Sequence, residues 1–147
     1  MWATYDDSNF PIVNVKMDGV PENNEDFQNF LDTWNSYNSD KLNSGKVPYI
    51  FVFDTTEVGM VNMKYAIKMT SFIKELKKQK NQYLKGSVII VKNKYIKFLL
   101  KFIFFMQKPV ADVHLTESDD KDFLNKLVAE INIGIEKPYN NVSIVRA

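Results

Sequence analysis

The stretch from residue 48 to residue 53 constrains the fold most, because it reads Pro-Tyr-Ile-Phe-Val-Phe and is apolar at every position. Neighbouring side chains of a strand point to opposite faces of a sheet. A strand that is apolar on both faces is therefore covered from both sides, as in sheets flanked by helices. This stretch predicts a central strand of an α/β domain.

Strand-like and helix-like patterns alternate along the rest of the chain. Val13, Val15 and Met17 alternate with polar residues, which predicts a half-buried strand. The expected strands are 2–6, 11–18, 48–53, 87–91 and 110–115, with the first turn at residues 7–9. The expected helices are 24–39, a helix capped by Asn62 and ending near residue 80, 94–107, and a helix capped by Thr116 or Ser118 and ended by Gly134.

This alternation predicts a fold of the α/β class. Strands that alternate with helices pair in parallel through right-handed crossovers. We expect one domain over residues 1–147, with a single mixed sheet of about five strands flanked by four helices in the order ββαβαβαβα. Residues 138–147 form a tail with a weak apolar alternation, which is a possible further edge strand.

Composition narrows the class of protein. The 147 residues suit one domain, and the lack of Cys excludes disulfides, thiolate metal sites and a Cys nucleophile. The first residues lack the basic start and apolar core of a signal peptide. The longest apolar stretches are far shorter than the ~20 residues of a spanning helix. We therefore expect a cytoplasmic protein.

Charge is distributed unevenly along the chain. Residues 64–108 contain 12 Lys and one acid, Glu75, although the net charge of the whole chain is only +1. Such a block favours an anionic partner. We do not expect nucleic acid, because the only Arg is Arg146, and Arg is the commoner choice for bidentate contacts to phosphate and guanine.

The predicted helix 94–107 has the most informative pattern. At about 100° per residue, one face holds Tyr95, Ile96, Leu99, Phe102, Ile103 and Met106, and the opposite face holds Lys94, Lys97, Lys101 and Lys108. The lysines are then bordered by Phe98, Phe104 and Phe105. Phenylalanines beside lysines are typical of a membrane-interface helix or of a docking surface. A helix buried on most sides, with its lysines reaching out to solvent, gives the same pattern.

The order of elements resembles the STAS fold of the bacterial anti-sigma factor antagonists, with the strand that ends in Phe-Asp-Thr-Thr-Glu-Val-Gly at 53–59 leading into a capped helix. The resemblance implies a non-enzymatic module that binds a protein partner. In that family a phosphorylatable Ser begins the helix after this strand. Here Asn62 stands for the Asp of the family's motif and Lys64 falls near its Ser, so no phosphorylation switch is implied.

Residues 49–115 also resemble the CRAL-TRIO lipid-binding domain. The similarity rests on Phe-Asp-Thr-Thr at 53–56, Tyr-Leu at 83–84, Ile-Ile-Val-Lys-Asn at 89–93 and Lys-Pro at 108–109. This second resemblance implies that the domain binds lipid.

Polar residues near the carboxyl edge of the predicted sheet form a possible ligand site, because open α/β sheets bind ligands there. They are Asp54, Thr55, Thr56, Asn62 and His114. Asp54, a Thr and the only histidine would be the parts of a hydrolase or phosphotransfer enzyme. Asp and Thr are also ordinary turn residues, and we interpret His114 as a partly exposed histidine beside Asp112. We therefore expect no catalysis, no metal site and no cofactor.

Three functional hypotheses follow. The first is a STAS-like interaction module that docks on an acidic protein, or on a second copy of itself, through helices 62–80 and 94–107. The second is a peripheral protein that binds lipid or an anionic membrane surface with the same lysines. The third is an enzyme that uses Asp54 and His114. The binding residues expected for the first two are Lys64, Lys68, Lys94, Lys97, Phe98, Lys101, Phe104 and Phe105.

Overall fold

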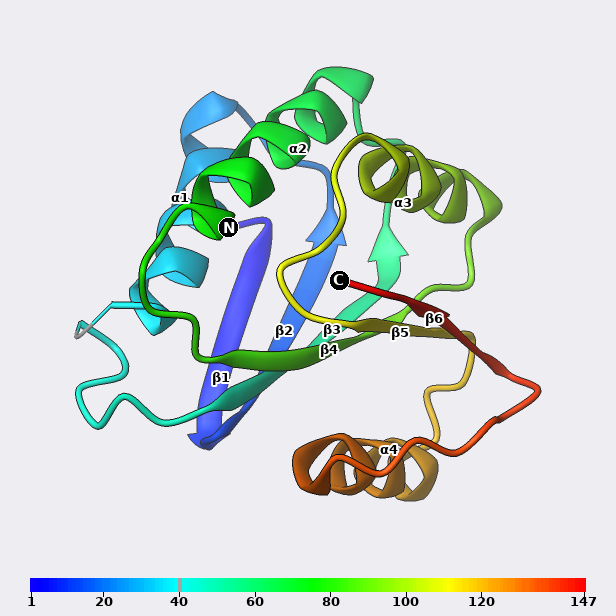
Figure 1. The fold of residues 1–147 in the computed structure, drawn as a ribbon. Helices are drawn as coiled ribbons and strands as arrows, with labels where there is room; N and C mark the ends of the chain where they lie inside the picture. The colour runs from blue at the N-terminus through cyan, green and yellow to red at the C-terminus, as the bar shows by residue number, and fades with distance from the viewer. Residues whose placement is uncertain (40) are drawn as a thin grey trace.

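The computed structural model describes residues 1–39 and 41–147, which form one six-stranded sheet with four helices packed on it (Figure 1). The strands are β1 (Ala3–Asn9), β2 (Ile12–Gly19), β3 (Tyr49–Val58), β4 (Leu84–Ile90), β5 (Val113–Thr116) and β6 (Val142–Val145). The helices are α1 (Asn24–Tyr37), α2 (Met63–Lys77), α3 (Lys94–Met106) and α4 (Lys121–Ile133). The predicted α/β class and single mixed sheet are confirmed.

The strands lie in the sheet in the order in which they occur in the chain. β2 to β5 are parallel, whereas β1 and β6 pair antiparallel with their neighbours and form the two edges. β6 comes from the tail 138–147 and makes six strands instead of about five. The observed order is therefore ββαβαβαβαβ.

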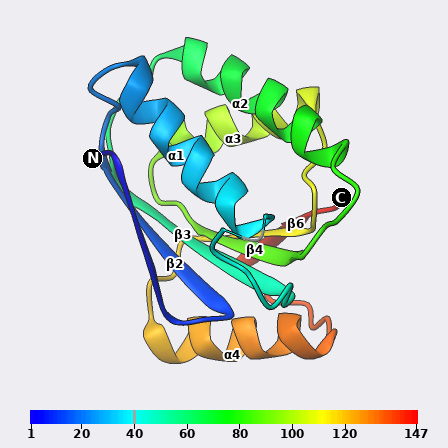
Figure 2. The ribbon, with the colours of Figure 1, turned by 90° about the vertical axis from the view of Figure 1, so that its left-hand side faces the viewer.

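The helices divide between the two faces of the sheet, with α1, α2 and α3 on one face and α4 on the other (Figure 2). The first three helices connect β2 to β3, β3 to β4 and β4 to β5, so each crossover moves one strand in the same direction. Right-handed crossovers that move in one direction place their helices on the same face. α4 leaves the last parallel strand and packs on the opposite face.

Residues 49–53 of β3 are apolar because the two faces of the strand contribute to two different cores. Phe51 and Phe53 point into the larger core, under α1, α2 and α3. Ile50 and Val52 point into the smaller core, under α4. The larger core is aromatic at its centre, where the ring of Phe51 contacts five other aromatic rings at centroid distances of 5.1 to 6.1 Å.

The predicted turn at residues 7–9 is wrong, because β1 continues through these residues. The pairing with β2 shifts register between Asp6 and Asn9, and the chain reverses only after Asn9. The backbone N–H of Phe10 donates to the carbonyl of Asp7 at 2.9 Å, so the turn residues form an irregularity within the strand.

β3 also exceeds its predicted end at residue 53. Its last residues, Glu57 and Val58, pair with Asp18 and Gly19 of β2. The intervening Thr55 and Thr56 are β-branched, and such residues favour strands as well as turns. The polar residues predicted to follow the strand therefore lie within it.

Capping residues mark the ends of the helices. Asn62 caps α2 as predicted, and its Oδ1 accepts from the backbone N–H of Lys64 at 2.9 Å. Gly134 ends α4 in the left-handed conformation, also as predicted. The cap of α4 is Asp120 instead of Thr116 or Ser118, and it accepts from the N–H of Phe123 at 3.2 Å.

Candidate functional site

α3 is held against the larger core by one buried side of the helix. Asn93 caps its first turn by accepting from the backbone N–H of Tyr95 at 2.7 Å. Ile96, Leu99 and Ile103 are buried against the sheet. Met106, which the helical pattern placed on the same inner face, is 58% exposed and so contradicts that prediction.

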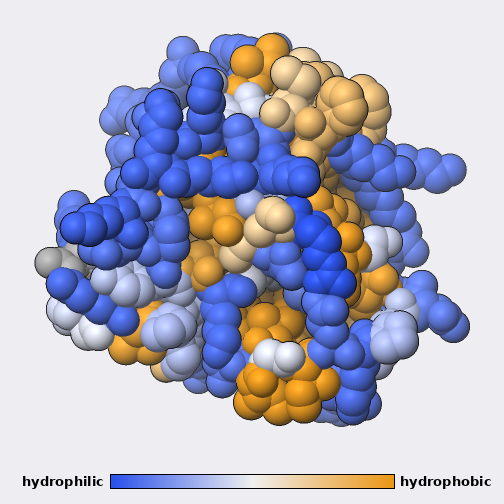
Figure 3. All heavy atoms as spheres, viewed as in Figure 1, coloured by the Kyte–Doolittle hydropathy of each residue, from blue (hydrophilic) through white to orange (hydrophobic). Residues whose placement is uncertain are grey.

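The outward face of α3 carries alternating lysines and phenylalanines. Lys94, Phe98, Lys101 and Phe105 follow one another at spacings of four, three and four residues, so they lie in one row, the α3 stripe. Phe98 is 54% exposed and Phe105 is 87% exposed. Phe104 is half-buried and packs against the larger core. Figure 3 shows a group of hydrophobic side chains over α3, next to hydrophilic ones.

The lysines around α3 differ in their ionic partners. Lys97 forms an ion pair with Glu117, and Lys92 forms one with Asp119 at 2.9 Å. Among the residues that the structure describes, Lys94 and Lys101 have no carboxylate oxygen within 4.0 Å. The stripe therefore presents two lysines whose charge is not neutralised by an ion pair.

One side of α2 extends this surface. Lys77 of α2 reaches across to the carbonyl oxygen of Lys108 at 3.3 Å, which shows which side of α2 faces α3. Lys74 precedes Lys77 by three residues and lies near that side of α2, whereas Ile67, ten residues before Lys77, is turned about 80° away from it toward solvent. Ile67 is 53% exposed. The sequence pattern did not indicate that Ile67 and Met106 are exposed, because a helical wheel does not show how much of a helix its neighbours cover.

The two predicted binding lysines of α2 lie elsewhere. The ammonium groups of Lys64 and Lys68 lie 4.9 and 5.8 Å from the centre of the Tyr65 ring. Tyr65 itself packs against Phe27 of α1 at 4.7 Å. The structure thus places Lys64 and Lys68 toward α1, and Lys94 and Lys101 on the outer face of α3.

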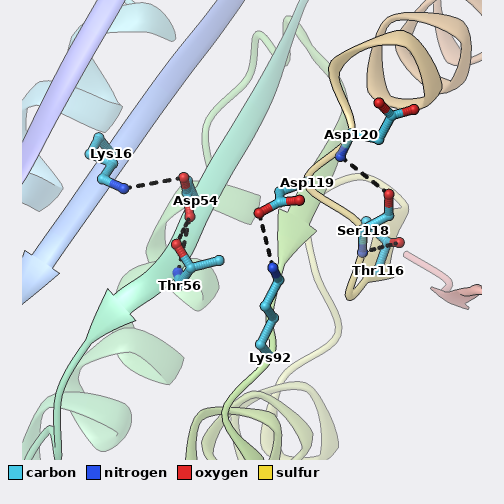
Figure 4. A network of polar contacts seen from close by, with 8 residues as sticks. All are labelled: Lys16, Asp54, Thr56, Lys92, Thr116, Ser118, Asp119 and Asp120. Carbon is cyan, nitrogen blue, oxygen red and sulfur yellow. Dashed lines mark hydrogen bonds and ion pairs between the residues drawn. The ribbon is translucent and has the colours of Figure 1, made fainter.

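Part of the predicted strand-edge site is assembled, on the α4 side of the sheet (Figure 4). Asp54 accepts from the hydroxyl and the backbone N–H of Thr56 at 2.7 and 3.0 Å and pairs with Lys16 at 3.4 Å. Partial burial opposes ionisation of Asp54, but these hydrogen bonds and Lys16 outweigh it and lower its pKa. The pair lies at a groove of about 860 Å³ between the β1–β2 hairpin and α4, which the sequence did not predict.

The other predicted members of the strand-edge site do not join Asp54. Thr55 points into the larger core, and its hydroxyl donates to the carbonyl of Ile90 at 2.7 Å. Asn62 is occupied as the cap of α2. His114 lies further along the sheet, between Val88 of β4 and Ile144 of β6. No group of three His, Asp or Glu in the described part of the chain is placed to hold a metal ion.

His114 is buried, contrary to the interpretation of a partly exposed histidine. It is 6% exposed because β6 covers the edge of β5, and its Nδ1 has no hydrogen-bond partner among the described residues. Burial lowers its pKa, although the backbone of Ser87 and the charge of Asp112 oppose this effect. The histidine is therefore neutral in the folded protein over a wider pH range than in the unfolded chain.

This burial makes stability depend on pH. As the pH falls below 6.5, the ordinary pKa of histidine, His114 is protonated in the unfolded chain before it is protonated in the folded one. We expect the free energy of unfolding to decrease from about pH 7 to about pH 5.5, by at most about 1.4 kcal/mol per pH unit. His114→Leu should abolish this slope. Urea denaturation at several pH values measures it, and an equal slope in both proteins would refute the assignment.

Comparisons with protein-family models and with curated proteins find no match to this chain. The likeness to STAS and CRAL-TRIO domains stays a prediction. Within the described residues, none of the helices has the length and hydropathy needed to cross a membrane.

Proposed function

We propose that this domain acts by binding, without catalysis, and that the α3 stripe attaches it to an anionic phospholipid surface. The observation that supports this most is the 87% exposure of Phe105 in a row that also contains Phe98 and two lysines that form no ion pair with the residues the structure describes. Large apolar side chains that gather on a surface mark an interaction site. Lysines beside them favour a negatively charged partner.

The arrangement around the stripe favours a membrane over an acidic protein. Phe98 and Phe105 are exposed on the outer face of α3 and do not line the groove beside Asp54, whereas hot spots of protein interfaces cluster in packed pockets. Lys74 and Lys77 lie on the α2 side of these rings, and Lys94 and Lys101 lie among them. An interfacial helix inserts its apolar side chains while lysines meet the anionic headgroups.

The enzyme hypothesis has less support. Asp54 is bonded to Thr56 and Lys16, while His114 is buried on β5, between Val88 of β4 and Ile144 of β6. A nucleophile, a base and an orienting acid must lie within hydrogen-bond reach of one another, and the structure does not bring these residues together.

Flotation with lipid vesicles tests the proposal. The protein should float with vesicles of phosphatidylcholine and phosphatidylserine but not with phosphatidylcholine alone. Raising the salt concentration from about 0.1 M to about 1 M should weaken binding, because the Debye length falls from about 10 to about 3 Å. Absence from both vesicle fractions would refute the membrane proposal and leave docking on an acidic protein as the better explanation of the stripe.

A further inference from the structure

The larger core contains an apolar cavity of about 130 Å³ between the sheet and the three helices α1, α2 and α3. Its walls come from the inner sides of all three helices and from strands β2 to β5, and they include Phe53, Ala66 and Leu99. Close packing normally leaves few voids larger than a water molecule. Cavities of about 150 Å³ lined by Leu, Ile and Phe stay dry and bind benzene-sized molecules. This cavity has a comparable size and lining.

One polar group beside the cavity has no partner. The indole of Trp34 lines the cavity and is 8% exposed, and its Nε1–H has no acceptor among the described residues. Trp normally finds a hydrogen-bond partner when it is buried. An unpaired buried donor is costly, so a ligand that offers an acceptor would gain from it.

Other residues with polar side chains also line the cavity. The hydroxyl of Thr55 donates to the carbonyl of Ile90, so its proton is not available to a ligand. Ser87 of β4 is buried on the same side of the sheet. The site would therefore select its ligand mainly by apolar shape, and Trp34 Nε1–H is the buried donor of the lining that lacks an acceptor among the described residues.

We propose that this cavity is a binding site for a compact, uncharged, mainly apolar molecule that carries one hydrogen-bond acceptor for Trp34. A charged ligand is disfavoured, because none of the lining residues is charged. The site is separate from the α3 stripe, since it is lined by the inner side of α3 and the stripe lies on the outer side.

Two probes of the same shape test both parts of the proposal. Acetophenone offers a carbonyl oxygen, whereas α-methylstyrene has a methylene group in its place. We expect calorimetric titration to show saturable binding of both, with acetophenone at least about fivefold tighter, as expected for one hydrogen bond. Trp34→Phe keeps an aromatic ring but removes the donor, and it should remove this preference.

Two further variants locate the binding. Ala66→Leu fills the cavity from α2, so it should abolish binding of both probes and raise Tm by about 2 to 6 °C. Leu127→Ala is the control, because it opens space in the smaller core on the other face of the sheet. It should lower Tm and leave both affinities unchanged.

The outcomes separate clearly. No saturable binding of either probe to the wild-type protein would overturn the site, and so would equal losses in Ala66→Leu and Leu127→Ala. Equal affinity for the two probes would overturn the acceptor for Trp34. If Ala66→Leu fails to fold, the comparison of the probes on Trp34→Phe still decides. Binding of dodecanoate in place of both compact probes would also contradict the proposal, since it would indicate a lipid-chain site.

Discussion

Replacing both Phe98 and Phe105 by Ser should weaken binding to phosphatidylserine-containing vesicles by at least about tenfold. Full burial of a Phe side chain contributes about 1.5–3 kcal/mol, and 1.4 kcal/mol corresponds to a factor of ten in Kd. Even partial insertion of two rings that are 54% and 87% exposed in solution reaches this effect. Vesicle flotation over a series of lipid concentrations measures the change.

The chain offers a matched control for this variant. Ile133 on α4 is 67% exposed and lies on the other face of the sheet. Ile133→Ser should leave vesicle binding unchanged. Lys101→Glu should reduce binding several-fold, since each lysine near an anionic surface contributes about 1 kcal/mol. If Ile133→Ser were as damaging as the Phe98 and Phe105 pair, binding would not be specific to the α3 stripe.

Phe51→Ala should destabilise the domain by about 3–5 kcal/mol, the usual cost of removing a buried Phe ring. Phe51 is 0% exposed, and it contacts the rings of Tyr5, Trp34, Tyr37, Tyr49 and Phe53. Whole domains are stable by only about 5–15 kcal/mol. We expect the variant to be close to unfolding at 37 °C, and urea denaturation would measure the loss.

The same substitution at an exposed ring is the control for stability. Phe105→Ala should change the free energy of unfolding by less than about 0.5 kcal/mol, because surface substitutions have small effects. A large loss of stability in Phe105→Ala would show that this ring is packed against the domain. The α3 stripe would then not be a free surface.

The sequence predicted the parts of the fold that depend on periodicity. The apolar run at 48–53 correctly indicated a central strand covered on both faces, and all four helices were located. The hairpin turn was misplaced because Asp7, Ser8 and Asn9 are turn residues that here form an irregularity inside β1. Local turn chemistry does not reveal that a strand continues beyond it.

The candidate site was predictable only along a single helix. The spacing within α3 identified the lysines and phenylalanines of the stripe, but it placed Met106 inside because it could not show how much of the helix is covered. The burial of His114 depends on β6, whose pairing with β5 joins residues far apart in the sequence. The cavity beside Trp34 depends on the packing of three helices on the sheet, for which no sequence pattern exists.

The position of Phe105 at a lipid surface is the most direct test of the proposed function. Because the chain has no Cys, Phe105→Cys and Asn125→Cys each allow labelling with an environment-sensitive fluorophore at one position. Asn125 is exposed on α4, on the other face of the sheet, and serves as the control. With phosphatidylserine-containing vesicles, we predict a blue-shifted emission at position 105 that is quenched by lipids with quenchers in their acyl chains. The emission of the label at position 125 should be the same with vesicles as without them, because this label stays in water. Two results would contradict the account. The first is an unshifted emission at position 105 on protein that is bound to vesicles, and the second is an equal emission shift at positions 105 and 125.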